Sequence, residues 1–150
     1  MRLSVLDLSP VGAGVTQAEA VRQTLEVAKA AERLGYDRFW VAEHHNIEGL
    51  ASPAPEILIA ALTQVTSTIR LGSGGVMLVN YSPLKVAEVF MELEALAPGR
   101  IDLGVGRALG ADGRTGAALR SASSEAFPHY FALLNAWLLD ASGKELIGPD

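Results

Sequence analysis

Short runs of apolar residues alternate along the chain with longer amphipathic segments. The runs cover residues 3–6, 38–42, 69–71 and 101–105, and after each of them apolar residues recur every three or four positions. Short apolar runs are typical of buried strands, and the longer spacing is typical of helices. The pattern therefore predicts four βα units of roughly 32 residues in a parallel sheet that helices cover.

Local signals mark where the helices begin and end. Thr16 and Glu19 have the spacing of a capping box, and Gly35 stands where a left-handed residue would end the same helix. Ser-Pro pairs predict further helix starts at residues 52–53 and 82–83. The residues expected to face the core from these three helices are Val21, Leu25, Ala28, Ala31 and Leu34, then Ile57, Leu58, Ala61, Leu62 and Val65, then Val86, Val89, Phe90, Leu93 and Leu96.

The region after the fourth run is less regular. Residues 106–116 form a glycine-rich loop, helical character returns from residue 117 and across residues 128–139, and residues 145–147 could begin a short strand. Four aromatic residues lie on apolar stripes and are expected in the core: Trp40, Phe90, Phe131 and Trp137.

The chain length limits the possible α/β folds. A closed (βα)₈ TIM barrel takes about 250 residues. The chain has 150 residues, so it accommodates roughly the first four βα units of such a barrel. A small flavodoxin-like open sheet of parallel strands would be complete at this length. Periodicity leaves both architectures open, and in either one residues 1–150 form a single domain.

Composition and charge narrow the function classes. The 12 basic and 17 acidic residues give a net charge of −5, which argues against electrostatic binding of nucleic acid or anionic membrane. The absence of cysteine excludes disulfides, thiolate metal sites and a cysteine nucleophile, and it fits a reducing cytoplasm. No apolar run approaches the roughly 20 residues of a membrane span, and no signal peptide is evident. We expect a cytoplasmic protein that acts on small molecules.

Candidate chemistry lies directly after the predicted strands, in residues 7–10, 43–46, 72–77 and 104–109. In parallel α/β folds the functional site forms at the carboxyl ends of the strands. We therefore expect these four segments to converge on one mouth.

The densest polar cluster is Glu43-His44-His45-Asn46. A histidine at a strand end can act as a general base or bind a ligand, and adjacent side chains point in roughly opposite directions, so one imidazole is expected to face the mouth. Alternatively, Glu43 and both imidazoles only satisfy backbone groups of the loop. A metal site is not predicted, because adjacent histidines do not share a face and His129 is remote in sequence.

Glycine-rich segments follow the third and fourth runs. Residues 72–75, Gly-Ser-Gly-Gly, allow the backbone to approach a planar or anionic ligand closely, or they form a tight turn. Residues 104–107 add Arg107, which could bind phosphate or pair with Asp112. They do not form a dinucleotide fingerprint, because Leu109 occupies the third glycine position.

Three segments together resemble the bacterial luciferase-like monooxygenases: residues 41–46 (VAEHHN), 71–78 (LGSGGVML) and 98–107 (PGRIDLGVGR). They match in order and in register, and the resemblance extends over at least residues 1–128. It implies a (βα)₈ barrel that uses reduced FMN, supplied by a separate flavin reductase, and O₂ to oxidise a small aldehyde-like substrate. The cofactor would carry the redox chemistry. We expect FMN rather than the deazaflavin F420.

Residue by residue, the resemblance implies specific roles. His44 corresponds to the family's active-site histidine near the flavin, and Gly74-Gly75 to a non-prolyl cis peptide bond under the flavin ring. Gly106 and Arg107 correspond to residues near the flavin phosphate. Because the family's further flavin contacts come from the second half of the barrel, we expect this chain to need a complementing chain or homo-oligomer formation. The alternative is an inactive truncated half-barrel or a dimerising interaction module.

Overall fold

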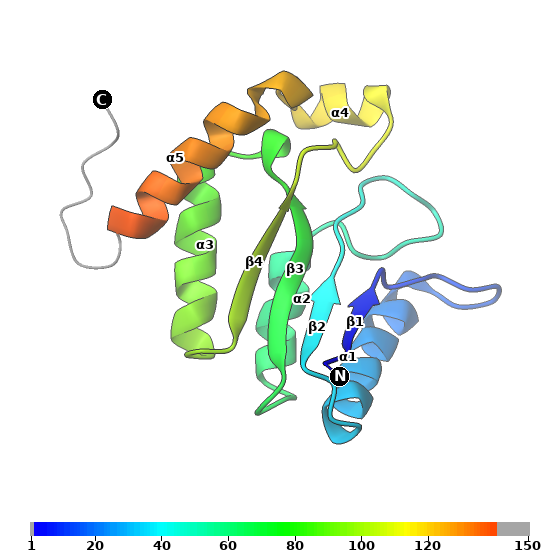
Figure 1. Cartoon of the computed structure of the whole chain (residues 1–150). Coiled ribbons are helices and arrows are strands. Elements are labelled where there is room, and N and C mark those ends of the chain that lie inside the picture. Colours follow the sequence, from blue (N-terminus) through cyan, green and yellow to red (C-terminus); the bar gives the residue numbers. More distant parts are fainter. Residues whose placement is uncertain (1, 141–150) are drawn as a thin grey trace.

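The computed structural model describes residues 2–140, and within them the strands form one parallel sheet (Figure 1). The strands pair in sequential order, β1-β2-β3-β4, as they do in a barrel. The flavodoxin-like alternative needs a different order and is wrong. The short strand expected at residues 145–147 lies outside the described residues. The strands are β1 (Ser4–Asp7), β2 (Arg38–Val41), β3 (Arg70–Met77) and β4 (Ile101–Gly106).

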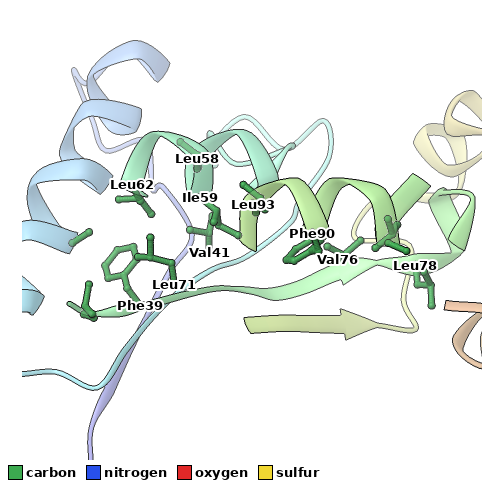
Figure 2. Close-up of a cluster of buried hydrophobic side chains, with 14 of the residues drawn as sticks. Phe39, Val41, Leu58, Ile59, Leu62, Leu71, Val76, Leu78, Phe90 and Leu93 are labelled. Atoms are coloured by element: carbon green, nitrogen blue, oxygen red, sulfur yellow. The ribbon is translucent and has the colours of Figure 1, made fainter. Parts of the chain in front are cut away.

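Helices alternate with the strands, and α2 and α3 cover one face of the sheet. Figure 2 shows apolar side chains packed between α2 and α3 on one side and the strands on the other, and α5 packs on α3. The helices are α1 (Gln17–Arg33), α2 (Pro55–Thr63), α3 (Pro83–Leu96), α4 (Gly113–Leu119) and α5 (Phe127–Asp140), with 3₁₀ turns η1 (Leu78–Asn80) and η2 (Ser124–Ala126).

Most of the predicted helix ends are confirmed. Thr16 and Glu19 form the capping box, with the Glu19 amide 3.2 Å from Thr16 Oγ1, and Gly35 has the expected positive φ of 77°. Helix α3 begins at Pro83 as predicted. The prediction for α2 is wrong by two residues, because it begins at Pro55. Ser52 is instead tied to the end of β1, where its hydroxyl donates to Leu8 O.

The buried face follows the predicted stripes except near helix ends. The expected core residues that are buried are Ala28, Ala31, Leu58, Leu62, Val86, Phe90 and Leu93. Leu34, Val65 and Leu96 are exposed because they lie at or beyond the last turn of their helices, where the chain leaves the core. Ile57 is exposed, and Ile59 is fully buried on the core side of α2 instead.

Two of the four aromatic residues expected in the core lie elsewhere. Phe90 is buried and Trp137 packs partly buried against the core, as predicted. Phe131 is 44% exposed and stacks on Phe127. Trp40 is half-buried, and its ring lies over Gly72 rather than among the core side chains, because it alternates along β2 with the buried Phe39 and Val41.

The glycine-rich segment at residues 72–75 lies inside β3, so its interpretation as a turn after the strand is wrong. A Cβ on Gly72 would stand 2.6 Å from the Trp40 ring, and a Cβ on Gly75 would stand 2.9 Å from the backbone of Gly104 in β4. The glycines therefore allow Trp40 and the neighbouring strand to approach β3 closely. The Gly74-Gly75 peptide bond is cis, as the resemblance implied.

The sheet face that carries Trp40 is less covered than the helix-facing side. Leu6 in β1 is 55% exposed. Toward the amino ends of the strands, Arg38 and Arg70 both bind the Asp102 carboxylate, at 3.0 and 2.6 Å. In a closed barrel this face, which we call the inner face, would point to the interior.

Gly104→Ala tests the close packing of β3 against β4. The new Cβ would collide with the Ser73 carbonyl oxygen. We expect the substitution to lower the free energy of unfolding by about 1–3 kcal/mol, as overpacking does, in urea denaturation. Gly49→Ala is the control, because a Cβ there meets nothing within 4 Å. Equal stability of the two variants would contradict this account.

Glu32 anchors the start of β3 from the end of α1. Its Oε1 accepts hydrogen bonds from the amides of Ser67, Thr68 and Ile69 at 2.8, 2.6 and 3.0 Å. Burial by itself raises the pKa of Glu32, but these amide hydrogen bonds outweigh it and lower the pKa from 4.5 to about 2. The charged form is therefore favoured in the folded chain.

This lowered pKa predicts acid-dependent stability. The stabilisation is present above pH 4.5 and is lost as the pH falls toward 2, because the unfolded chain binds the proton first. Glu32→Gln should cost about 1–2 kcal/mol at neutral pH, after allowance for solvent screening, and nothing near pH 2. Urea unfolding across this range measures the difference. Glu88→Gln, at an exposed carboxylate, should show no such pH dependence.

Candidate functional site

A fully buried carboxylate joins the carboxyl ends of β2 and β3. Glu43 is 0% exposed, and its Oε1 accepts a hydrogen bond from the Tyr81 hydroxyl at 2.8 Å and lies 2.6 Å from His45 Nε2. Its Oε2 accepts from the Met77 amide at 2.9 Å. These contacts satisfy both oxygens of a group that would otherwise be costly to bury.

The same cluster reaches the loop after β4. The His45 amide donates to Gly110 O at 2.9 Å, and Gly110 has a positive φ of 64°. The residues after β1 join from the other side, where the Ala51 amide donates to Ser9 O. The segments after all four strands therefore meet at one edge, as expected. Glu43 accepts from a backbone amide at the end of β3, and the His45 ring contacts the Glu43 carboxylate, so the alternative in which these side chains only satisfy loop backbone groups is wrong for both.

Burial and neighbouring charge raise the pKa values of two groups here, Tyr81 and Glu56. Burial raises the pKa of Tyr81 well above its usual value, and the neighbouring Glu43 carboxylate raises it further. Burial likewise raises the pKa of Glu56, which lines a cavity of about 170 Å³ together with Tyr81. Tyr81 therefore stays protonated at neutral pH and acts as a donor to Glu43.

His44 has a different environment from His45, as the alternation along the chain predicts. Its imidazole lines a cavity of about 610 Å³ between the first half of α1 and the loop of residues 46–53. Its backbone amide donates to Ser52 O at 3.0 Å, but its buried Nδ1 has no hydrogen-bond partner. A buried nitrogen without a partner marks a place where a ligand or water can bind.

The other predicted site residues lie apart from this cavity. Gly74 is an exposed glycine beside Trp40 and Leu6, and Gly75 lies against β4. Gly106 lies against Met77, the residue whose amide binds Glu43. None of these residues, nor Arg107, lines the His44 cavity. His44 therefore lies in one region, and Gly74, Gly75 and Gly106, which we call the glycine strip, lie in a second.

Arg107 is exposed, and within residues 2–140 it makes no hydrogen bond or ion pair. The alternative of an ion pair with Asp112 is wrong, because the Asp112 carboxylate caps α4 by accepting from the Thr115 amide at 2.7 Å. The guanidinium is therefore available to an anionic ligand.

Sequence reasoning missed Tyr81. The apolar run at residues 69–71 predicts a strand that ends at residue 71, ten residues before Tyr81. Because β3 continues to Met77 and η1 follows it, Tyr81 lies close to the mouth. If the predicted strand is continued through the glycines of residues 72–75 to Met77, Tyr81 becomes a candidate site residue.

Two features are absent from the part of the chain that the structure describes. No three His, Cys, Asp or Glu side chains in residues 2–140 gather closely enough to hold a metal ion. No helix among these residues is long and apolar enough to span a bilayer.

Four parallel βα units in sequential order, with polar residues gathered at the carboxyl ends of the strands, define part of a TIM-barrel protein. The chain belongs to the luciferase-like monooxygenase family, whose model matches residues 1–138.

Individual relatives agree with this assignment. The chain is 51% identical to a luciferase-like monooxygenase of Escherichia coli over 137 residues, which is 89% of this chain and 41% of the relative. It is 57% identical to the N-acetyl-S-alkylcysteine monooxygenase of Bacillus subtilis over 110 residues, 73% of this chain and 33% of that protein. The chain thus spans less than half the length of these relatives.

Solved structures show the same fold. Apo-MsnO8 matches with a TM-score of 0.90 and 49% identity, over 99% of this chain and 48% of that one. The fold also occurs, at 20% and 21% identity, in an FMN complex of the oxygenating constituent of 3,6-diketocamphane monooxygenase (TM-score 0.79) and in an F420-dependent secondary alcohol dehydrogenase (TM-score 0.57). The match to the monooxygenase covers 91% of this chain and 39% of that one. The match to the dehydrogenase covers 71% of this chain and 32% of that one.

Tyr81→Phe tests the role of the buried cluster. The substitution keeps the ring but removes the hydroxyl that donates to the Glu43 carboxylate. We expect a loss of about 1.5–3 kcal/mol in the free energy of unfolding, the usual range for a hydrogen bond to a charged group. Tyr36→Phe is the control, since the Tyr36 hydroxyl makes no hydrogen bond among the described residues. Urea denaturation measures the stability of both variants, and equal stability would contradict a stabilising hydrogen bond from Tyr81 to Glu43.

Proposed function

We propose that this chain supplies the first half of the active-site mouth of a flavin-dependent monooxygenase, which uses reduced FMN and O₂ to oxidise a small organic substrate. Family membership over residues 1–138, together with the unpartnered His44 Nδ1 at a cavity, carries the proposal. The chain matches 41% of the length of its Escherichia coli relative, and we propose that turnover needs the rest of a barrel.

The residues present fit a flavin. Gly74 exposes backbone without a side chain on the inner face, where a planar ring can approach closely, and Gly75 continues this strip. Gly106 follows on β4, and Arg107 offers a guanidinium that no carboxylate in residues 2–140 occupies. An aromatic ring and a phosphate are the two parts of FMN that such groups bind. The fold alone does not distinguish FMN from F420, and we propose FMN on the family resemblance of residues 41–46 and 71–78.

Bound reduced flavin supplies the electrons that activate O₂, and a separate flavin reductase supplies the reduced flavin. The chain's own contribution is positioning. The glycine strip would support the ring, Arg107 would bind the phosphate, and His44 would present an imidazole for proton transfer at the cavity. The Glu43–His45–Tyr81 cluster keeps the ends of β2, β3 and β4 in place for these contacts.

A second candidate function is an interaction module without turnover. In the described part of the chain β1 and β4 each pair on one side only, and Leu6 is 55% exposed on the inner face. Open edges and exposed apolar surface favour association. Two copies could therefore complete each other as a homo-oligomer. The absence of cysteine supports a cytoplasmic location for either function.

His44→Ala tests the first candidate. The chain is combined with the C-terminal part of the Escherichia coli relative, FMN, a flavin reductase and an aldehyde series, and O₂ consumption is recorded. We expect turnover to fall by about 10²–10⁴-fold, as on removal of a general acid or base, while FMN affinity measured by fluorescence changes little.

His129→Ala is the matched control, because His129 is an exposed histidine on α5 that lies outside the cavity. Turnover of His44→Ala equal to that of this control would remove His44 from the mechanism. A defined dimer of the chain by light scattering, with no O₂ consumption in the combined sample, would favour the second candidate.

A further inference from the structure

The 610 Å³ cavity beside His44 has a mixed lining, of which the flavin proposal uses only His44. Val21 from α1 and Ile47 from the loop contribute apolar side chains, and Gln17 and Arg22 come from the first two turns of α1. Arg22 is the one basic side chain among the lining residues, and Glu48 is the one carboxylate. Cavities of this size commonly hold small organic molecules.

The walls of the cavity are held by backbone contacts. The Val11 amide donates to Gly49 O at 2.8 Å, and the Ala51 amide donates to Ser9 O at 2.9 Å. Pro10 and Leu50 form an antiparallel bridge between the same two loops. The loop of residues 46–53 is therefore fixed against the end of β1.

The Arg22 guanidinium is exposed, and it interacts electrostatically with Glu19 in the preceding turn of α1. Within residues 2–140 it makes no hydrogen bond or ion pair, and Glu48 in the same lining is not within ion-pair distance. By contrast, Arg38 and Arg70 on the inner face are held by Asp102. A guanidinium without a hydrogen-bonded carboxylate, next to apolar side chains, is well suited to the two oxygens of a ligand carboxylate.

His44 adds a second polar group to the same lining. Its Nδ1 is buried without a hydrogen-bond partner, and the residue is part of the cavity lining. A ligand held by Arg22 would lie in the cavity that the imidazole lines. The cavity therefore combines a cation, an imidazole and apolar walls.

We propose that this cavity binds a small organic anion, with its apolar body against Val21 and Ile47 and its carboxylate on Arg22. Naming this anion as the substrate rests on the proposed function, whereas its binding does not depend on flavin. The cavity would thus select a substrate by the substrate's carboxylate and not by an aldehyde carbonyl.

The test compares two probes of equal shape, hexanoate and hexanamide, titrated into the chain and followed by ligand-observed NMR. Hexanoate should bind at least about 10-fold more tightly than hexanamide, because its charge is paired by a guanidinium. Arg22→Gln should abolish this preference, and Arg22→Lys should restore part of it. Arg33→Gln is the matched control, since Arg33 is an exposed arginine on the same helix but outside the cavity.

Three results would overturn the proposal: equal binding of the two probes, an unchanged preference in Arg22→Gln, or displacement of hexanoate by FMN. The last result would assign the cavity to the flavin. Simultaneous binding of hexanoate and FMN supports the proposal. Hexanoate binding in a chain that binds no FMN would contradict the proposed function while leaving the anion site standing, so the two failures can be told apart.

Discussion

The architecture of the mouth depends on a buried carboxylate that has no lysine or arginine partner within residues 2–140. Glu43 is enclosed where β2 ends, and it is stabilised by the Tyr81 hydroxyl, the His45 ring and the Met77 amide. A buried carboxylate is tolerated only where hydrogen bonds replace its hydration. Those bonds come from the segments after β2 and β3, and the His45 backbone extends the connection to the loop after β4. Burial of this one carboxylate therefore connects the ends of β2 and β3 directly, and the loop after β4 through the His45 backbone.

The two faces of the sheet serve different purposes. On the helix-facing side, Phe39, Val41 and Leu71 pack into a continuous apolar core, and this packing holds the βα units together. On the inner face, glycines in β3 and β4 let Trp40 lie close to the backbone, while Asp102 joins Arg38 to Arg70. The inner face thus combines exposed backbone, an aromatic ring and paired charges, a composition suited to the interior of a barrel with a ligand at its mouth.

The adjacent histidines show how one short segment can serve two roles. His45 is buried against the carboxylate and helps to hold the scaffold, whereas His44 lines the cavity and keeps one ring nitrogen without a partner. The alternation of side-chain direction along an extended chain places them in different environments. Structural support and ligand contact are therefore separated by a single residue.

The order of βα units, the capping of α1, most of the buried stripe and the family could be predicted from the amino-acid sequence. These features depend on local chemistry and periodicity, which neighbouring residues carry. The amino-acid sequence could not determine that Gly72 lies within a strand, that Tyr81 reaches Glu43, or that Arg22 and His44 share a cavity. Each of these depends on contacts between segments distant along the chain. These contacts are visible only in the folded chain, because the length of a strand and the partners of its side chains depend on the strand, ring or loop that packs against it.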